Sequence, residues 1–209
     1  MDENFIPNVL SITLFIVSFI ISLRAFYLSY RARSRRLFIL GLSMAVISLT
    51  AAAGYAGDNV TSVSLNVDWF NYIGQTVSFL FILLSLLRSS DEYLRKLMNW
   101  QIAVSFLLLI LMFLAPVLPP EFPAPAVTKS ILSGSRGVIC LVIFYYYALA
   151  FMKKETRFSF LMAAAFLLLS FGYCIIIPKY ISPNDALDRG GDIIRICGLV
   201  TLFLATLVG

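Results

Sequence analysis

Two groups of polar side chains interrupt apolar stretches of the chain at helical spacing. Asp68, Asn71 and Gln75 recur at i, i+3 and i+7, and Asp192 precedes Arg195 at i, i+3. On helices, each group lies on one face. Ionisable side chains inside a membrane are costly, so they usually face protein or water and mark functional positions. The two groups therefore predict a site that binds a small ligand or an ion.

Arg136 is a further candidate, because it lies well inside an apolar stretch. It follows Lys129 by about 10 Å at the rise of an α-helix, and its neighbours in the sequence SGSRG are small. Small residues let another helix approach closely. We expect Arg136 to face the protein interior, with Tyr173 and Tyr55 nearby.

We expect these groups to converge in the outer half of a helix bundle, where they line a small polar cavity. The candidate ligand-binding residues are Asp68, Asn71, Gln75, Arg136, Tyr173, Asp192 and Arg195. Asp188 shares a face with the last two if their helix begins that early. A structural interpretation of Asp192 and Arg195 stays open, because a carboxylate is favoured near a helix N-terminus and an arginine can extend to the membrane surface.

The composition argues against common catalytic and metal chemistry. The chain contains no histidine, which removes the commonest general base and metal ligand and the usual haem ligand. Cys140, Cys174 and Cys197 lie in apolar stretches without CxxC spacing, which indicates packing residues. No nucleophile is adjacent to a base. We therefore expect no metal, no cofactor and no enzyme activity.

The elements that position these residues are membrane helices. Hydrophobic residues make up 60% of the chain and charged residues 13%, with a mean hydropathy of +0.92. Apolar stretches close to the ~20 residues that cross a bilayer recur throughout the sequence. They lie at residues 9–27, 37–56, 69–87, 97–118, 131–152, 158–177 and 192–209. The sequence predicts an all-α membrane protein with seven transmembrane helices and a single domain over residues 1–209.

The distribution of arginine and lysine predicts the orientation of these helices. Basic residues cluster after the first, third and fifth stretches, at 24–36, 88–96 and 153–157, whereas most acidic residues lie in or near the alternate connections. Loops rich in Lys and Arg stay in the cytoplasm. We therefore expect a multi-pass protein of the cell membrane, with its N-terminus outside and its C-terminus in the cytoplasm.

The net charge of +5 does not indicate a nucleic-acid partner, because the basic residues lie beside membrane spans, where the bilayer and its anionic headgroups attract them. The densest cluster is the sequence RARSRR, which contains Arg31, Arg33, Arg35 and Arg36. It is interpreted either as a site for anionic lipid headgroups or as a determinant of topology.

The sequence also contains an internal similarity. Arg36 leads into LFILGLSMAVISLTAAAGY and Arg157 into FSFLMAAAFLLLSFGY, and after an acidic connection these are followed by GQTVSFLFILLSLL and GLVTLFLATLVG. The pattern suggests a 3+1+3 arrangement, in which the first three and the last three helices are parallel repeats. Parallel repeats of this kind occur in transporters.

The segment Gly191-Asp192-x-x-Arg195-x-x-Gly198 resembles the start of the last membrane helix in multi-span sensor modules of prokaryotic histidine kinases and diguanylate cyclases. The resemblance implies a helix that carries a signal to a cytoplasmic partner, or to an output domain beyond Gly209. We therefore expect a non-enzymatic membrane sensor or signal-coupling module. A small-solute transporter of the 3+1+3 type and a structural subunit of a larger membrane complex stay open as alternatives.

Overall fold

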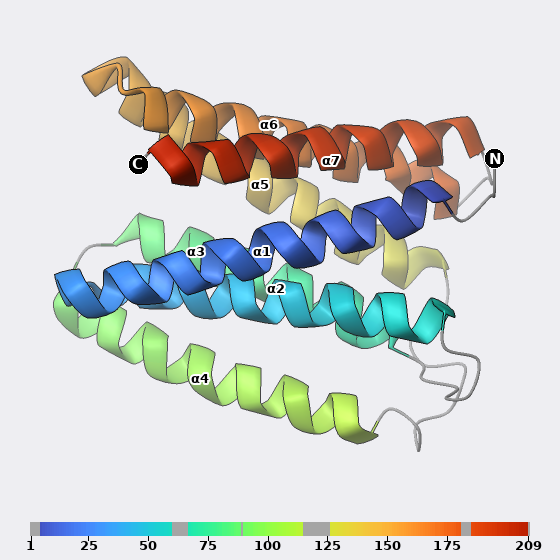
Figure 1. Ribbon diagram of the computed structural model, residues 1–209, viewed down its shortest axis with the longest axis horizontal. Coiled ribbons are helices and arrows are strands. Elements are labelled where there is room, and N and C mark those ends of the chain that lie inside the picture. Colours follow the sequence, from blue (N-terminus) through green and yellow to red (C-terminus); the bar gives the residue numbers. More distant parts are fainter. Residues whose placement is uncertain (1–4, 60–66, 89, 115–125, 181–184, 209) are drawn as a thin grey trace. The chain divides into compact units, whose positions relative to one another are not determined.

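The computed structural model describes residues 5–59, 67–88, 90–114, 126–180 and 185–208. Over these ranges the chain is helical apart from short connections, which confirms the all-α class (Figure 1). The helices are α1 Phe5–Ala32, α2 Arg35–Asn59, α3 Asp68–Leu87, α4 Asp91–Leu114, α5 Ala126–Lys154, α6 Arg157–Ile176 and α7 Asp185–Val208, with the short 3₁₀ helix η2 Ile177–Tyr180 after α6.

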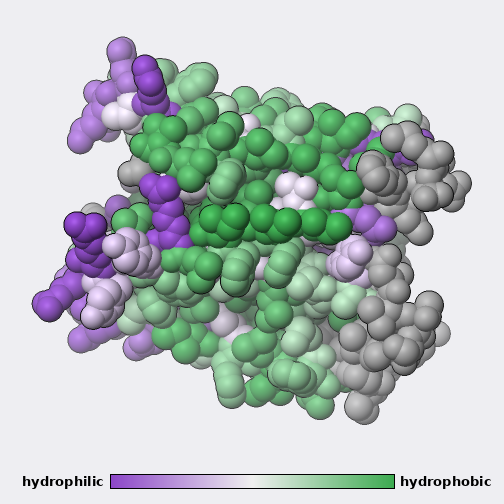
Figure 2. All heavy atoms as spheres, in the orientation of Figure 1, coloured by the Kyte–Doolittle hydropathy of each residue, from purple (hydrophilic) through white to green (hydrophobic). Residues whose placement is uncertain are grey.

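Seven of the described helices are long and apolar enough to cross a membrane, which agrees with the number of apolar stretches in the sequence. All seven described helices begin earlier than the apolar pattern indicates. The difference is largest for α4, which begins at Asp91 instead of Leu97, and for α7, which begins at Asp185 instead of Asp192. In each unit hydrophilic side chains gather at a short connection, α1–α2 in one and α5–α6 in the other, and hydrophobic side chains cover the helices that follow (Figure 2).

The chain divides into two compact units, which are described separately. The α5–α7 unit comprises residues 1–17 and 125–209, and the α2–α4 unit comprises residues 18–124, including the second half of α1. The single domain expected over the whole chain stays a prediction.

In the α2–α4 unit, α2 packs against both α3 and α4. Its apolar core includes Phe70 and Phe81 of α3. A buried amide adds a polar link, because Gln101 Nε2 of α4 donates to the Ile39 carbonyl at 3.0 Å and to Ser43 Oγ at 2.8 Å. Polar bonds of this kind hold helices together where lipid removes the hydrophobic drive for association.

In the α5–α7 unit, α6 packs against both α5 and α7. The Ser170 hydroxyl of α6 donates to the Gly137 carbonyl of α5 at 2.9 Å. Glycines bring α6 and α7 very close: a Cβ atom on Gly172 would lie 2.5 Å from Arg195 Cγ, and one on Gly198 would lie 3.0 Å from Leu169 Cγ. Packing of small residues at helix contacts is typical of membrane bundles.

Two helical hairpins have connections of the same form. Arg33 and Ser34 join α1 to α2, and Glu155 and Thr156 join α5 to α6. The first residue of each connection is left-handed, with φ of 50° at Arg33 and 46° at Glu155. The second is a hydroxyl residue, and Thr156 caps α6 by accepting the Ser159 amide at 3.3 Å. Connections this short make each pair of helices antiparallel neighbours.

Candidate functional site

The ring of Tyr173 is the meeting point of three helices in the α5–α7 unit. Tyr173 belongs to α6 and is buried. The guanidinium carbon of Arg136 on α5 lies 4.6 Å from the ring centre, and that of Arg195 on α7 lies 5.4 Å away. Cations within about 6 Å of an aromatic face are attracted by the negative face of the ring, more strongly when water is excluded. The ring therefore links α5, α6 and α7 through one set of contacts.

Asp192 completes this cluster. It forms an ion pair with Arg195, one turn further along α7. Only 4% of Asp192 is exposed, and the Arg195 side chain is 17% exposed. Because α7 begins at Asp185, Asp192 lies beyond its first turn, where the field of the helix terminus has fallen off. The protein therefore largely covers this ion pair, as is expected if Asp192 and Arg195 face the inside of the bundle and do not extend to the membrane surface. Arg136, Tyr173, Asp192 and Arg195 are called the arginine–tyrosine cluster below.

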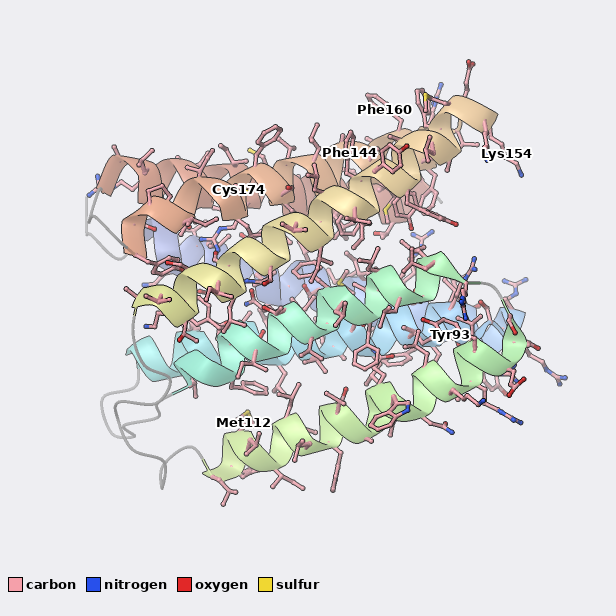
Figure 3. All side chains as sticks on the ribbon, turned by 180° about the vertical axis from the view of Figure 1, so that it is seen from behind. Tyr93, Met112, Phe144, Lys154, Phe160 and Cys174 are labelled. Carbon is pink, nitrogen blue, oxygen red and sulfur yellow. The ribbon has the colours of Figure 1, made fainter. Side chains whose placement is uncertain are left out.

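Small residues surround Arg136 on α5. Arg136 is 3% exposed, and its neighbours Ser133, Gly137 and Cys140 are also buried. A Cβ atom on Gly137 would lie 2.9 Å from the sulfur of Cys174. Cys174, which is labelled in Figure 3, follows Tyr173 on α6. The close approach predicted from SGSRG is therefore observed between α5 and α6. It brings the arginine to the tyrosine.

Asp188 has a different partner from the one its spacing indicates. It lies on α7 one turn before Asp192, but it pairs with Lys179 of η2. The Lys179 side chain is 43% exposed and that of Asp188 is 22% exposed. This ion pair belongs to the edge of the unit and lies outside the buried cluster.

The other predicted residues lie in the α2–α4 unit. Gln75 is buried on α3 and its Nε2 donates to Asn71 Oδ1, one turn earlier. Asn71 Nδ2 would lie 3.2 Å from a Cβ atom on Gly54 of α2, and the next residue, Tyr55, is 39% exposed. Asp68 is the first residue of α3, and its side chain lies outside the described part. The convergence of both sets in one cavity stays a prediction.

The two polar sets have a common pattern that the sequence contains but that was not predicted. Asp68-x-x-Asn71-x-x-Gly74 on α3 matches Asp192-x-x-Arg195-x-x-Gly198 on α7. In each unit the middle residue of the pattern packs against a glycine of the preceding helix, Gly54 for Asn71 and Gly172 for Arg195. Each of these glycines is followed by a tyrosine. The internal similarity of the sequence already pairs the segments that begin at Gly74 and Gly198, and extending it six residues towards the N-terminus would have found the preceding Asp-x-x-polar part.

Among the described residues, no group of three or more Cys, Asp or Glu side chains is arranged to hold a metal ion. The sulfur of Cys140 is buried beside Arg136, whereas Cys174 and Cys197 are exposed. The described cysteines form no disulfide.

Comparison with protein families, with curated proteins and with solved structures finds no match. The geometry of the arginine–tyrosine cluster is thus the basis on which a function can be argued.

Proposed function

We propose that the chain is a non-enzymatic sensor or signal-coupling module of the cell membrane, in which the arginine–tyrosine cluster controls the position of α7. The observation that supports this proposal most is the arrangement of two guanidinium groups, from α5 and α7, around one ring on α6. Any displacement of α7 against its neighbours changes the contacts of Arg195 with Tyr173.

The cluster favours a few discrete positions of α7 over a continuous range of positions. The ion pair of Arg195 with Asp192 moves with α7, because both residues lie on that helix. The contact of Arg195 with the Tyr173 ring of α6 is lost when α7 is displaced, so α7 is favoured where that contact is made. Well-packed helix contacts also resist continuous deformation. The contacts of Gly172 and Gly198 restrict α7 in the same way, because a Cβ atom at either position would lie 3.0 to 3.2 Å from backbone atoms of the other helix. A stimulus changes the balance if it favours one arrangement over the other.

The resemblance of residues 191–198 to the last helix of sensor modules supports the same interpretation. In the proposed orientation, α7 enters from the outside with the cluster near its start and ends in the cytoplasm at its far end. A change at Arg195 is thereby carried along one rigid helix to Val208. The receiver would be a cytoplasmic signalling partner.

Distance measurements between two helix ends test this proposal. Spin labels at Arg157, the first residue of α6, and at Val208, the last residue of α7, lie at the same end of two antiparallel helices. Both positions are exposed. The labelled chain, free of other cysteines, is reconstituted into lipid nanodiscs, and the distances between the labels are measured by electron paramagnetic resonance. Tyr173→Leu is expected to change the distribution of these distances, whereas Tyr173→Phe is expected to retain it. An identical distribution in all variants would exclude control of α7 by the cluster.

A 3+1+3 transporter is the second candidate, and the repeated pattern on α3 and α7 favours it. The hairpin connections agree with a repeat, because the backbone is left-handed at both Arg33 and Glu155 and a hydroxyl residue follows each. Counted equally from Ser34 and Thr156, three buried residues of α2 have buried counterparts in α6, although Gly54 and Gly172 then differ by four positions. The corresponding pairs are Met44 with Phe166, Ile47 with Leu169, and Ser48 with Ser170.

Buried residues also correspond between α3 and α7, the third helices of the two proposed repeats. When Gly74 is matched to Gly198, Gln75 corresponds to Leu199, Ser78 to Leu202 and Phe81 to Ala205, and all are buried. We infer that α1–α3 and α5–α7 are parallel repeats joined by α4. Since parallel repeats are common in transporters, solute uptake by vesicles containing the purified chain tests this candidate. Uptake that Asn71→Ala and Arg195→Gln both abolish would favour transport over sensing.

A further inference from the structure

The four arginines at the α1–α2 connection have two different environments. Arg35 Nη1 lies 2.9 Å from Asp91 Oδ1 and donates to the Asp91 carbonyl at 3.4 Å. Arg36 Nη2 donates to the Arg88 carbonyl at 3.3 Å. Both residues therefore connect the start of α2 to the α3–α4 connection of the same unit. Their guanidinium groups are already engaged in protein contacts.

Arg31 and Arg33 are exposed, and within the described part of the chain their side chains form no ion pair or hydrogen bond. Their backbone is nevertheless fixed. The Ser29 hydroxyl donates to the Ser34 carbonyl at 2.9 Å, and the Ser34 amide donates to the Ser29 carbonyl at 3.2 Å. Arg33 lies between them with φ of 50°. Two available guanidinium groups are thus held on an ordered turn.

The exposed face of α1 leads directly to these arginines. Ile20, Leu23, Tyr27 and Arg31 follow one another at i, i+3, i+7 and i+11, so they lie along one face. Their side chains are exposed, with Tyr27 at 62% and Leu23 at 55%. Figure 2 shows hydrophobic side chains along α1 and hydrophilic ones at the end that adjoins α2. The order along the face is aliphatic, then phenolic, then cationic.

This order is complementary to a phospholipid lying beside the helix. An acyl chain contacts aliphatic side chains, tyrosine prefers the interfacial region, and guanidinium groups bind phosphate oxygens in a bidentate manner. We propose that the α1 face and the α1–α2 turn bind one anionic phospholipid, with its phosphate at Arg31 and Arg33 and an acyl chain along Leu23 and Ile20. A free anion would use only the arginines and would gain nothing from the aliphatic face.

Lipid titration of the detergent-purified chain tests the proposal. Binding of phosphatidylglycerol is measured by native mass spectrometry, with phosphatidylcholine of the same acyl chains for comparison. The wild-type chain is expected to bind phosphatidylglycerol preferentially. The double substitution Arg31→Gln with Arg33→Gln is expected to weaken that binding roughly tenfold to thirtyfold, because each basic residue near a bilayer contributes a factor of about five.

A variant with the same loss of charge is the control. Arg95→Gln with Lys153→Gln removes two exposed basic residues elsewhere and is expected to leave phosphatidylglycerol binding unchanged. Equal weakening in both variants would show diffuse attraction and would overturn the proposal. Competition by glycerol 3-phosphate at matched concentration would show a site for free anions and would also overturn it. Because Arg31 and Arg33 are exposed, the thermal midpoint in phosphatidylcholine is expected to be the same in all variants.

Discussion

The guanidinium carbon of Arg136 lies 4.6 Å from the centre of the Tyr173 ring, and both residues are buried. This contact joins α5 to α6, and the second contact of the ring, with Arg195, extends it to α7. A desolvated cation at an aromatic face contributes about 2 kcal/mol or more. Removal of the Tyr173 ring is therefore expected to weaken the contacts of α6 with both α5 and α7.

Replacement of Tyr173 separates the role of its ring from that of its hydroxyl. Tyr173→Leu removes the face that both arginines contact, and it is expected to lower the free energy of unfolding by about 3 kcal/mol, through lost packing and lost cation–π attraction. Tyr173→Phe retains the face and is expected to cost about 1 kcal/mol or less. Unfolding in mixed micelles with increasing dodecyl sulfate measures both values. Equal losses in the two variants would contradict a role for the ring.

The charges of the cluster are expected to be coupled. Asp192→Asn removes the carboxylate and leaves two cations near Tyr173, so a loss of about 2 kcal/mol is expected. Addition of Arg136→Leu removes one of those cations and should recover part of the loss, with a coupling energy between about 0.5 and 3 kcal/mol. The same unfolding titration on the two single variants and the double variant completes the cycle. Strictly additive effects would mean that Arg136 and Asp192 act independently.

The α6–α7 contact is expected to tolerate no side chain at Gly172. A Cβ atom there would lie 3.0 Å from the carbonyl oxygen of Gly191 and 3.2 Å from the amide nitrogen of Arg195, which are backbone atoms that cannot rotate away. Gly172→Ala should therefore destabilise the protein by about 1 to 3 kcal/mol. Gly190→Ala is the matched control on α7, because nothing lies within 4 Å of a Cβ atom at that position. A neutral effect of Gly172→Ala would show that the helices can separate freely.

The proposed orientation predicts a pattern of chemical labelling. In a chain whose three cysteines are replaced, a cysteine at Ser34 or Ser90 should be shielded from an impermeant thiol reagent in intact cells, because both positions lie within clusters of basic residues. A cysteine at Ser64 should react. Permeabilised cells, in which all three positions react, provide the control. The reverse pattern would place the C-terminus outside and would remove the basis for signalling towards the cytoplasm.

The spans could be predicted because length and hydropathy alone identify a membrane helix, whereas helix starts could not. Asp91 and Glu92 lie in the first turn of α4, where acidic residues are favoured by the helix terminus. A hydropathy pattern leaves such charged residues out of the predicted span, although they belong to the helix. The same error placed the start of α7 at Asp192, seven positions after the observed first residue, Asp185.

The cluster was predictable only in part. Helical spacing indicates that Asp192 and Arg195 share a face, and small neighbours indicate a close approach at Arg136. The spacing of Asp188 suggested the same set, but Lys179 of η2 binds it instead. Which side chain on a second helix lies opposite depends on the register between helices. Contacts such as that of Gly172 with Arg195 set this register, and hydropathy contains no information about them.

The short connection between α5 and α6 has a consequence for the way in which the chain enters a bilayer during synthesis. Glu155 and Thr156 alone separate the two helices, so α5 and α6 can insert together as a hairpin before α7 has been translated. In such a hairpin Arg136 would already contact Tyr173 and would not cross the hydrocarbon as an isolated charge. Arg195 arrives later with Asp192 on its own helix. In this order of insertion, Arg136 and the partly buried Arg195 would each have a partner on entry, which would lower the barrier that a lone cation faces.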